Sequence, residues 1–205
     1  MEQEIQDISI QRIQEAIPHL QGIDNELIID YTEYTMPNDK HPIHRYPIRF
    51  DGLYIGLREK GKARFSINLK EFEVGANDLV ICSPDDLVQA TLQNDNHLVQ
   101  SMVVSSHFLK EMYISLNSFM PFFAARKDHP VFHLTDDEVK ELKSYFMLIK
   151  ENVVSDDYFR LDTTKRLLAA YLYKLGSILY RHRPELQAEA SKPLKREEIL
   201  FKEFI

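Results

Sequence analysis

The sequence has a single cysteine, Cys82, and no apolar run approaches the roughly 18 residues that a membrane-spanning helix needs. One thiol cannot form an internal disulfide, and such sparse use of cysteine suits a reducing compartment. The residues that follow Met1 include Glu2, Glu4 and Asp7, which is unlike the start of a secretory signal peptide. These absences predict a cytoplasmic protein that does not associate with membranes.

Positive charge is also scarce. The formal net charge is −7, from 25 Lys and Arg against 32 Asp and Glu. Proteins that bind nucleic acid gain most of their affinity by neutralising phosphates, so this balance excludes direct DNA contact by this segment. The apolar fraction of 44%, with 12 Phe and 10 Tyr, is typical of a globular protein with a substantial core.

Short alternating segments fill residues 27–108. Apolar and polar residues alternate over 53–58 and again over 63–70, and a Gly-containing turn at 59–62 joins the two. Period-2 patterns around a short turn predict a hairpin with one wet face and one dry face. Residues 75–86 form a turn, an apolar strand and a Pro-Asp-Asp corner. Seven or eight such strands at close spacing predict an antiparallel β-barrel or jelly roll.

Residues 135–182 have helical periodicity. Thr135 and Glu138 form the sequence pattern of a capping box, and two apolar seams follow with a short acidic loop between them. This predicts an antiparallel helix pair. Four leucines of the second helix are spaced as a and d positions, so they either pair with a second subunit or cover the barrel: Leu168, Leu172, Leu175 and Leu179.

The sequence therefore predicts a mainly β plus α protein in which a barrel precedes a helix pair. A short helix within 5–20 should end near Pro18. The chain closes on an amphipathic run after a polar stretch with two prolines, which we interpret as a linker and the truncated start of another helix. The expected divisions are an N-terminal segment 1–26, a barrel 27–112, a helical dimerisation region 113–182 and the linker region 183–205.

The barrel segment resembles the cupin superfamily, whose metal-binding members place histidines on two strands. No histidine lies between Arg45 and Asn96, so the corresponding strands lack these ligands. His41 and His44 lie on a Pro-rich loop, and Pro130 separates His129 from His133, so neither pair has helical ligand geometry. We predict no metal and no cofactor.

Catalytic constellations are missing as well. Cys82 sits in an apolar strand without a neighbouring base, where its thiol should be unreactive core. No nucleophile elbow, phosphate-binding loop or dinucleotide fingerprint occurs. The chain is not expected to be an enzyme.

A small-molecule pocket remains possible, because barrels of this size can hold one ligand. Arg58 and Arg64 on neighbouring segments could clamp a carboxylate or sugar hydroxyls, and Tyr54 shares the face of Arg58. The same face could equally be the solvated side, because alternation identifies two faces but not the one that lines a cavity. Tyr54, Arg58 and Arg64 are the candidate effector-binding residues.

The order of these regions resembles the N-terminal portion of AraC-type transcriptional regulators, of the sort common in Bacteroidetes. The resemblance is carried by 46–53, 75–84, 106–112 and 196–204, together with the succession of barrel, helix pair and linker. It implies a cupin-like sensor and dimerisation domain, whose effector lies in the barrel. It also implies a C-terminal DNA-binding domain with two helix-turn-helix motifs, which this sequence lacks.

The expected partners are therefore a second copy of the chain, a small effector such as a sugar or small acid, and DNA only through the missing domain. Two other functions stay open at this point. One is a standalone small-molecule-binding protein of cupin-like fold, and the other is a metal-dependent cupin enzyme.

Overall fold

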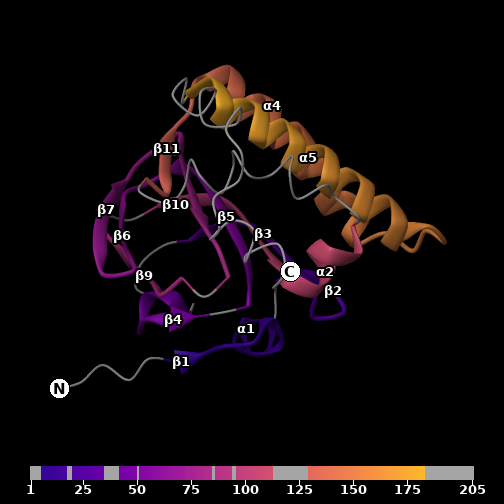
Figure 1. Ribbon diagram of the computed structural model, residues 1–205, viewed down its shortest axis with the longest axis horizontal. Helices are drawn as coiled ribbons and strands as arrows, with labels where there is room; N and C mark the ends of the chain where they lie inside the picture. Colours follow the sequence, from indigo (N-terminus) through magenta and orange to yellow (C-terminus); the bar gives the residue numbers. More distant parts are fainter. Residues whose placement is uncertain are drawn as a thin grey trace, which may run out of the picture.

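A computed structural model describes residues 6–17, 20–34, 42–49, 51–84, 86–93, 96–112 and 129–182. Two β-sheets face each other, and a pair of long helices lies across the outer face of one of them (Figure 1). The prediction of an antiparallel barrel followed by a helix pair is thus confirmed. The segment 183–205, predicted to be a linker and the start of a helix, lies outside the described residues.

The six-stranded sheet has the order β11-β8-β5-β10-β3-β2 and is antiparallel throughout. Its strands are β2 (Gln21–Ile23), β3 (Leu27–Tyr34), β5 (Gly52–Lys60), β8 (Asp78–Cys82), β10 (His97–Ser105) and β11 (Val131–His133).

The five-stranded sheet has the order β1-β4-β9-β6-β7, in which only β1 and β4 pair in parallel. Its strands are β1 (Gln6–Asp7), β4 (Ile48–Arg49), β6 (Ala63–Ile67), β7 (Lys70–Val74) and β9 (Val88–Leu92). Shorter elements are α1 (Ile10–Ala16), the 3-10 turn η1 (Pro42–His44) and α2 (Ser106–Glu111).

The predicted hairpin of 53–58 with 63–70 is wrong. The strands β5 and β6 are consecutive but lie in opposite sheets, because the chain crosses between the sheets at Gly61, where φ is 84°. The true partner of β6 is β7, across a two-residue turn at Asn68 and Leu69 with φ of 50° and 68°. Leu69, expected inside a strand, is instead 83% exposed in this turn.

Both faces of β5 are buried, so the prediction that one of its faces is exposed to solvent is wrong. Leu53, Ile55 and Leu57 belong to the core beneath the helix pair. Tyr54 packs on the opposite face against the core between the two sheets, and Arg58 on that face is 4% exposed. The side of β5 that carries Tyr54 and Arg58 therefore faces the barrel interior.

The helix pair consists of α4 (Asp136–Val153) and α5 (Arg160–His182). The predicted capping box is confirmed: the Thr135 hydroxyl accepts from the Glu138 amide, and the Glu138 carboxylate accepts from the Thr135 amide. The end of α5 bonds to the start of α4 through Arg181 and His182, both on Glu138, so the helices are antiparallel. Among the described residues, no helix is long and apolar enough to cross a membrane.

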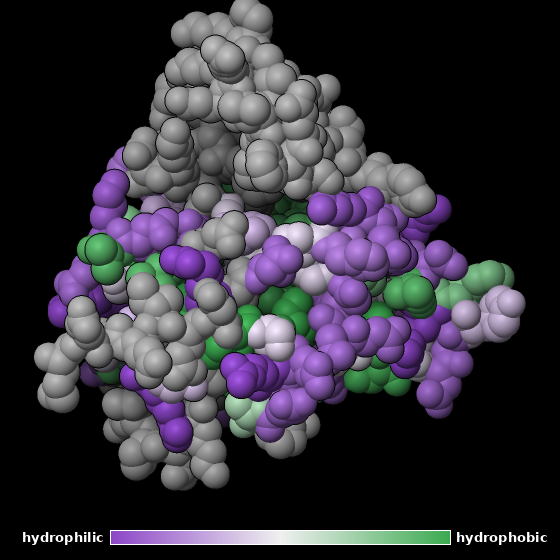
Figure 2. All heavy atoms as spheres, turned by 60° about the horizontal axis from the view of Figure 1, so that its bottom comes forward, coloured by the Kyte–Doolittle hydropathy of each residue, from purple (hydrophilic) through white to green (hydrophobic). Residues whose placement is uncertain are grey.

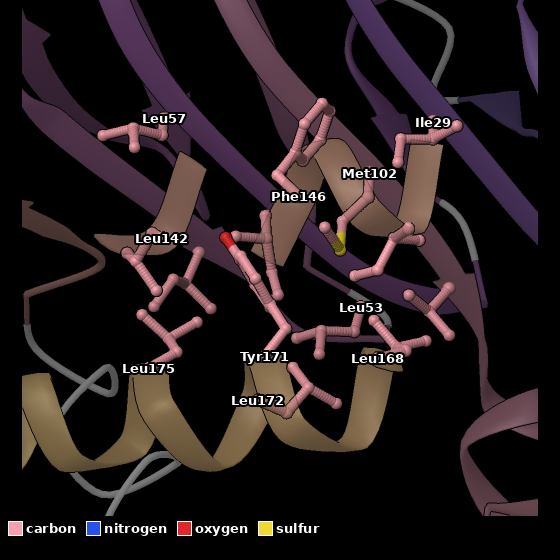
Figure 3. Close-up of a cluster of buried hydrophobic side chains, with 14 of the residues drawn as sticks. Ile29, Leu53, Leu57, Met102, Leu142, Phe146, Leu168, Tyr171, Leu172 and Leu175 are labelled. Atoms are coloured by element: carbon pink, nitrogen blue, oxygen red, sulfur yellow. The ribbon is translucent and has the colours of Figure 1, made fainter. Parts of the chain in front are cut away.

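The four leucines of the predicted dimer seam face inward. They are at most 1% exposed in the single chain, and Figure 3 shows Leu168 and Leu172 near Leu53 of the sheet and Leu175 near Leu142 of α4. Leu179 belongs to the same cluster. These side chains already pack within the single chain, so they cannot also contact a second subunit. The alternative that they cover the barrel is therefore correct for Leu168, Leu172, Leu175 and Leu179, and the alternative of a dimer seam is wrong.

The charge of Glu138 gives the helix pair a pH dependence. Burial raises the pKa of Glu138, but hydrogen bonds from His182, the Thr135 amide and Arg181 outweigh burial and lower the pKa to about 2. The unfolded carboxyl has a pKa of 4.5. Because the folded pKa is the lower one, this stabilisation is complete above the unfolded pKa and is lost as pH falls through the folded pKa.

Replacing Glu138 with glutamine should therefore lower the free energy of unfolding at pH 7, and the difference from wild type should shrink between pH 4.5 and pH 2. Urea unfolding followed by circular dichroism at several pH values measures this. Asp137→Asn is the matched control, because this neighbouring carboxylate is 95% exposed. A deficit of Glu138→Gln that stays constant down to pH 2 would contradict the assignment.

Candidate binding site in the barrel

A group of polar side chains lies inside the barrel on three adjacent strands. The register places Ser101 of β10 opposite Asp30 of β3 on one side and Gly56 of β5 on the other. Two residues further along, Val99 lies opposite Arg58. Because side chains alternate between the two faces of a strand, all of these face the interior. Asp30 is 6% exposed, which is rare for a carboxylate.

Arg58 is the buried cation of this group. Its Nη1 lies 2.8 Å from Nδ1 of His97, a residue with no exposed surface, and it also donates to the Lys60 carbonyl. A guanidinium can only donate, so Nδ1 of His97 must accept. The ring of His97 is therefore neutral, with its proton on Nε2.

His44 is held neutral by the same surroundings. Burial is the largest cause, and the electrostatic effects of Arg58 and then of His97 add to it, so the pKa of His44 is lowered to about 4. The turn η1, which carries His44, thus presents an uncharged imidazole to the site at neutral pH.

Tyr54 lies along the floor of the site and stays protonated. Burial raises its pKa, the proximity of Cys82 and Asp30 adds to the effect, and Arg58 opposes it. Gly56 makes this position possible, since a methyl group there would collide with the Tyr54 hydroxyl. The hydroxyl can both donate and accept a hydrogen bond.

A small cavity of about 20 Å³ adjoins Asp30 and Tyr54. Ser101 supplies a third polar group, while Ile13 of α1 and Leu20 close the cavity with apolar side chains. A space of this size holds about one water molecule, so it is too small for an organic effector. Where described residues are visible in Figure 2, hydrophilic side chains dominate the surface and hydrophobic ones show only in small areas.

The candidate effector residues do not form one cluster. Tyr54 and Arg58 face the interior, whereas Arg64 lies on the outer side of β6 with its side chain 48% exposed. Arg64 donates to Glu73 of β7 at 2.9 Å, and this hydrogen bond lowers the pKa of Glu73. A clamp built from Arg58 and Arg64 is therefore impossible in this fold.

Three interior residues escaped the sequence analysis, Asp30, His97 and Ser101, and it considered His44 only as a metal ligand. Asp30 interrupts an apolar strand, which is a usable signal for a buried polar site. The histidines flank the histidine-free stretch that argued against a metal, and only the fold brings them to Arg58. Among the described residues, no group of three or more His, Cys, Asp or Glu side chains could hold a metal ion. His41 lies outside the described residues.

The sequence matches no family model and no curated protein. Among solved structures, ToxT from Vibrio cholerae strain SCE256 bound to an unsaturated fatty acid has a TM-score of 0.43 and 9% identity, over 77% of this chain and 55% of that chain. An apo ToxT variant from the same strain has a TM-score of 0.46 and 10% identity, over 89% and 72%. A cupin 2 conserved barrel domain protein from Leptotrichia buccalis has a TM-score of 0.34 and 11% identity, over 42% and 39%. The chain thus spans about half of the first of these proteins.

Proposed function

We propose that this chain is the effector-sensing domain of an AraC-type transcriptional regulator, and that its effector binds in the barrel beside Arg58. The observation that carries the proposal is the buried polar group of Asp30, Tyr54, Arg58 and His97 in an otherwise apolar interior. Removing charges from water is costly, and replacing buried ion pairs with apolar side chains is often neutral or stabilising. The presence of such a group points to a role other than stability.

The chemistry of the group suggests the class of effector. Arg58 offers guanidinium donors that suit a carboxylate, while the Tyr54 hydroxyl and the Asp30 carboxylate can bind hydroxyl groups. A small organic acid that carries hydroxyl groups, such as a sugar acid, would use all three. The small size of the cavity requires the interior to expand during binding, and Ile13 of α1 and Leu20 belong to the wall that would have to move.

Regulation of DNA binding would follow from a shift in the populations of two conformations. An effector that binds one arrangement of barrel and helix pair better than another changes their proportions. In a homodimer in the cytoplasm, this change would alter how two attached DNA-binding domains are presented to DNA. Two linked domains bind DNA with greater avidity than one.

A binding experiment with matched arginine variants tests the proposal. Small hydroxy acids and sugars are screened by thermal shift, and the dissociation constants of hits are measured by isothermal titration calorimetry. Arg58→Met should weaken binding about 10- to 100-fold, because it removes a charge-assisted hydrogen bond in a dry site. Arg64→Met, on the outer surface, should leave the dissociation constant unchanged.

Tyr54→Phe is the second variant, since it deletes one hydroxyl without changing the charge of the barrel. It should weaken hydroxylated ligands about 5- to 10-fold and leave ligands without hydroxyls unaffected. If Arg64→Met weakened binding as much as Arg58→Met does, the site would lie elsewhere. If no acid or sugar stabilised the protein, the proposal of an effector of this class would fail.

A further inference from the structure

The end of β5 carries a bulge that touches both the barrel interior and the helix pair. Arg58 pairs with Val99 of β10 and Lys60 pairs with Leu98, so Glu59 is the extra residue between them. A bulge bends its strand and redirects the side chains around it. Glu59 faces away from the interior, as alternation along the strand requires for the residue after Arg58.

Glu59 binds helix α4. One carboxylate oxygen accepts from Nζ of Lys143 at 2.7 Å, and the same ammonium donates to the Tyr31 hydroxyl at 2.5 Å. The Glu59 side chain is only 16% exposed and that of Lys143 is 35% exposed. Partial burial makes this ion pair stronger than one on the open surface. It joins the sheet to α4 by a direct charged contact.

Strand β10 holds the same stretch of β5 from both sides. Inside the barrel, His97 accepts from Arg58. Outside, Gln100 is 3% exposed and donates to the other Glu59 oxygen at 2.6 Å. The Oε1 atom of Gln100 is buried and has no hydrogen-bond partner among the described residues, so the Glu59 contact is what orients this amide.

We propose that the Glu59 bulge couples the occupancy of the barrel to the position of α4. Arg58 and Glu59 are adjacent residues, so a ligand that pulls the Arg58 guanidinium away from His97 rotates the peptide group between them. The rotation displaces the Glu59 carboxylate and loosens its contact with Lys143. The first turns of α4 are thereby released from the sheet. This inference rests on the proposed function for the ligand, whereas the coupling itself is a property of the chain alone.

A mutant cycle without ligand tests the coupling. Hydrogen–deuterium exchange is measured in wild type, Arg58→Met, Lys143→Met and the double variant. Arg58→Met should speed exchange of the amides of 140–147 about tenfold in the wild-type background, through easier local opening. In the Lys143→Met background, where the contact is already cut, the further increase should be about twofold or less.

Lys165→Met is the matched control. Lys165 of α5 also joins a helix to the rest of the chain, through an ion pair with Glu111 of α2 at 2.7 Å. This ion pair includes no residue of the bulge. In that background the full tenfold response to Arg58→Met should persist. Amides of 168–179 serve as the reference for global stability. Should Arg58→Met fail to fold, Arg58→Lys keeps the charge and alters only the geometry of the bond to His97.

Equal acceleration in the wild-type and Lys143→Met backgrounds, or an equal rise in 168–179, would show that Arg58 acts on global stability and would overturn the proposal. Unchanged exchange of 140–147 would overturn it as well. Neither result would bear on whether an effector binds at Arg58, because the cycle contains no ligand. Failure to find an effector would likewise leave the measured coupling intact.

Discussion

Replacing Leu172 with alanine should lower the free energy of unfolding by about 2–5 kcal/mol, because it leaves a cavity in a closely packed core. Leu172 is 1% exposed and lies between α5 and the six-stranded sheet (Figure 3). Chemical denaturation monitored by circular dichroism measures the loss. The oligomeric state of the folded protein, measured by sedimentation at tens of micromolar, should not change.

Tyr173→Ala is the matched control for this prediction. Tyr173 is the next residue of α5 but is 45% exposed, so its replacement should change the free energy of unfolding by about 0.5 kcal/mol or less. If Leu172→Ala dissociated a dimer without lowering stability, the dimer seam would be the correct interpretation of the leucines after all.

Homodimerisation itself stays a proposal, and its interface would have to be a surface other than the buried leucines of α5. The outer face of α5 carries Tyr173 and Tyr180, seven residues apart and both exposed, with Gly176 and Ser177 between them. Within the part of the chain that the structure describes, this uncharged face is a candidate for joining two copies through α5. Tyr173→Ala would then weaken the dimer while leaving the fold intact.

Replacing Gly61 with alanine should cost about 2–4 kcal/mol of stability, through an unfavourable left-handed conformation and steric overlap. The φ of Gly61 is 84°, and an added methyl group would lie 2.5 Å from Nδ1 of His97 and 2.9 Å from the Asn96 carbonyl. The methyl group would occupy space beside the nitrogen that accepts from Arg58. Ligand affinity should therefore fall together with stability.

Gly176→Ala provides the opposite expectation from the same chemical change. This glycine lies within α5, and an added methyl group meets no atom within 4 Å. The substitution should raise the free energy of unfolding by about 0.5–1 kcal/mol, as expected for glycine in a helix interior. Thermal and urea unfolding measure the expected loss of stability in Gly61→Ala and the expected gain in Gly176→Ala. A Gly61→Ala variant as stable as wild type would contradict the close approach of Gly61 and His97.

Local signals in the sequence predicted the elements well and their partners poorly. The capping box and the apolar seams define α4 and α5, since both depend on residues within a few positions of each other. The pairing of β5 with β10 depends on residues about 40 positions apart, and alternation carries no information about that choice. The turn at Leu69 was missed because leucine is a rare residue at positive φ.

The candidate site was predictable only in part, for the same reason. Tyr54 and Arg58 were selected because they share a face of one strand, and they do lie together in the barrel. Arg64 was added on the assumption of a hairpin that the fold does not contain. His44 and His97 lie 53 positions apart by number, and the shift in the pKa of His44 arises from burial and charges that only the folded barrel assembles.

The small size of the barrel cavity has a kinetic consequence. An effector much larger than the cavity of about 20 Å³ can enter only during openings of the wall that contains Ile13 and Leu20. The observed association rate should then level off at high ligand concentration, at the rate of opening. The same barrier delays escape, so a bound effector would have a long residence time even at modest affinity. A regulator built this way would respond to the recent average of effector concentration and would ignore brief fluctuations.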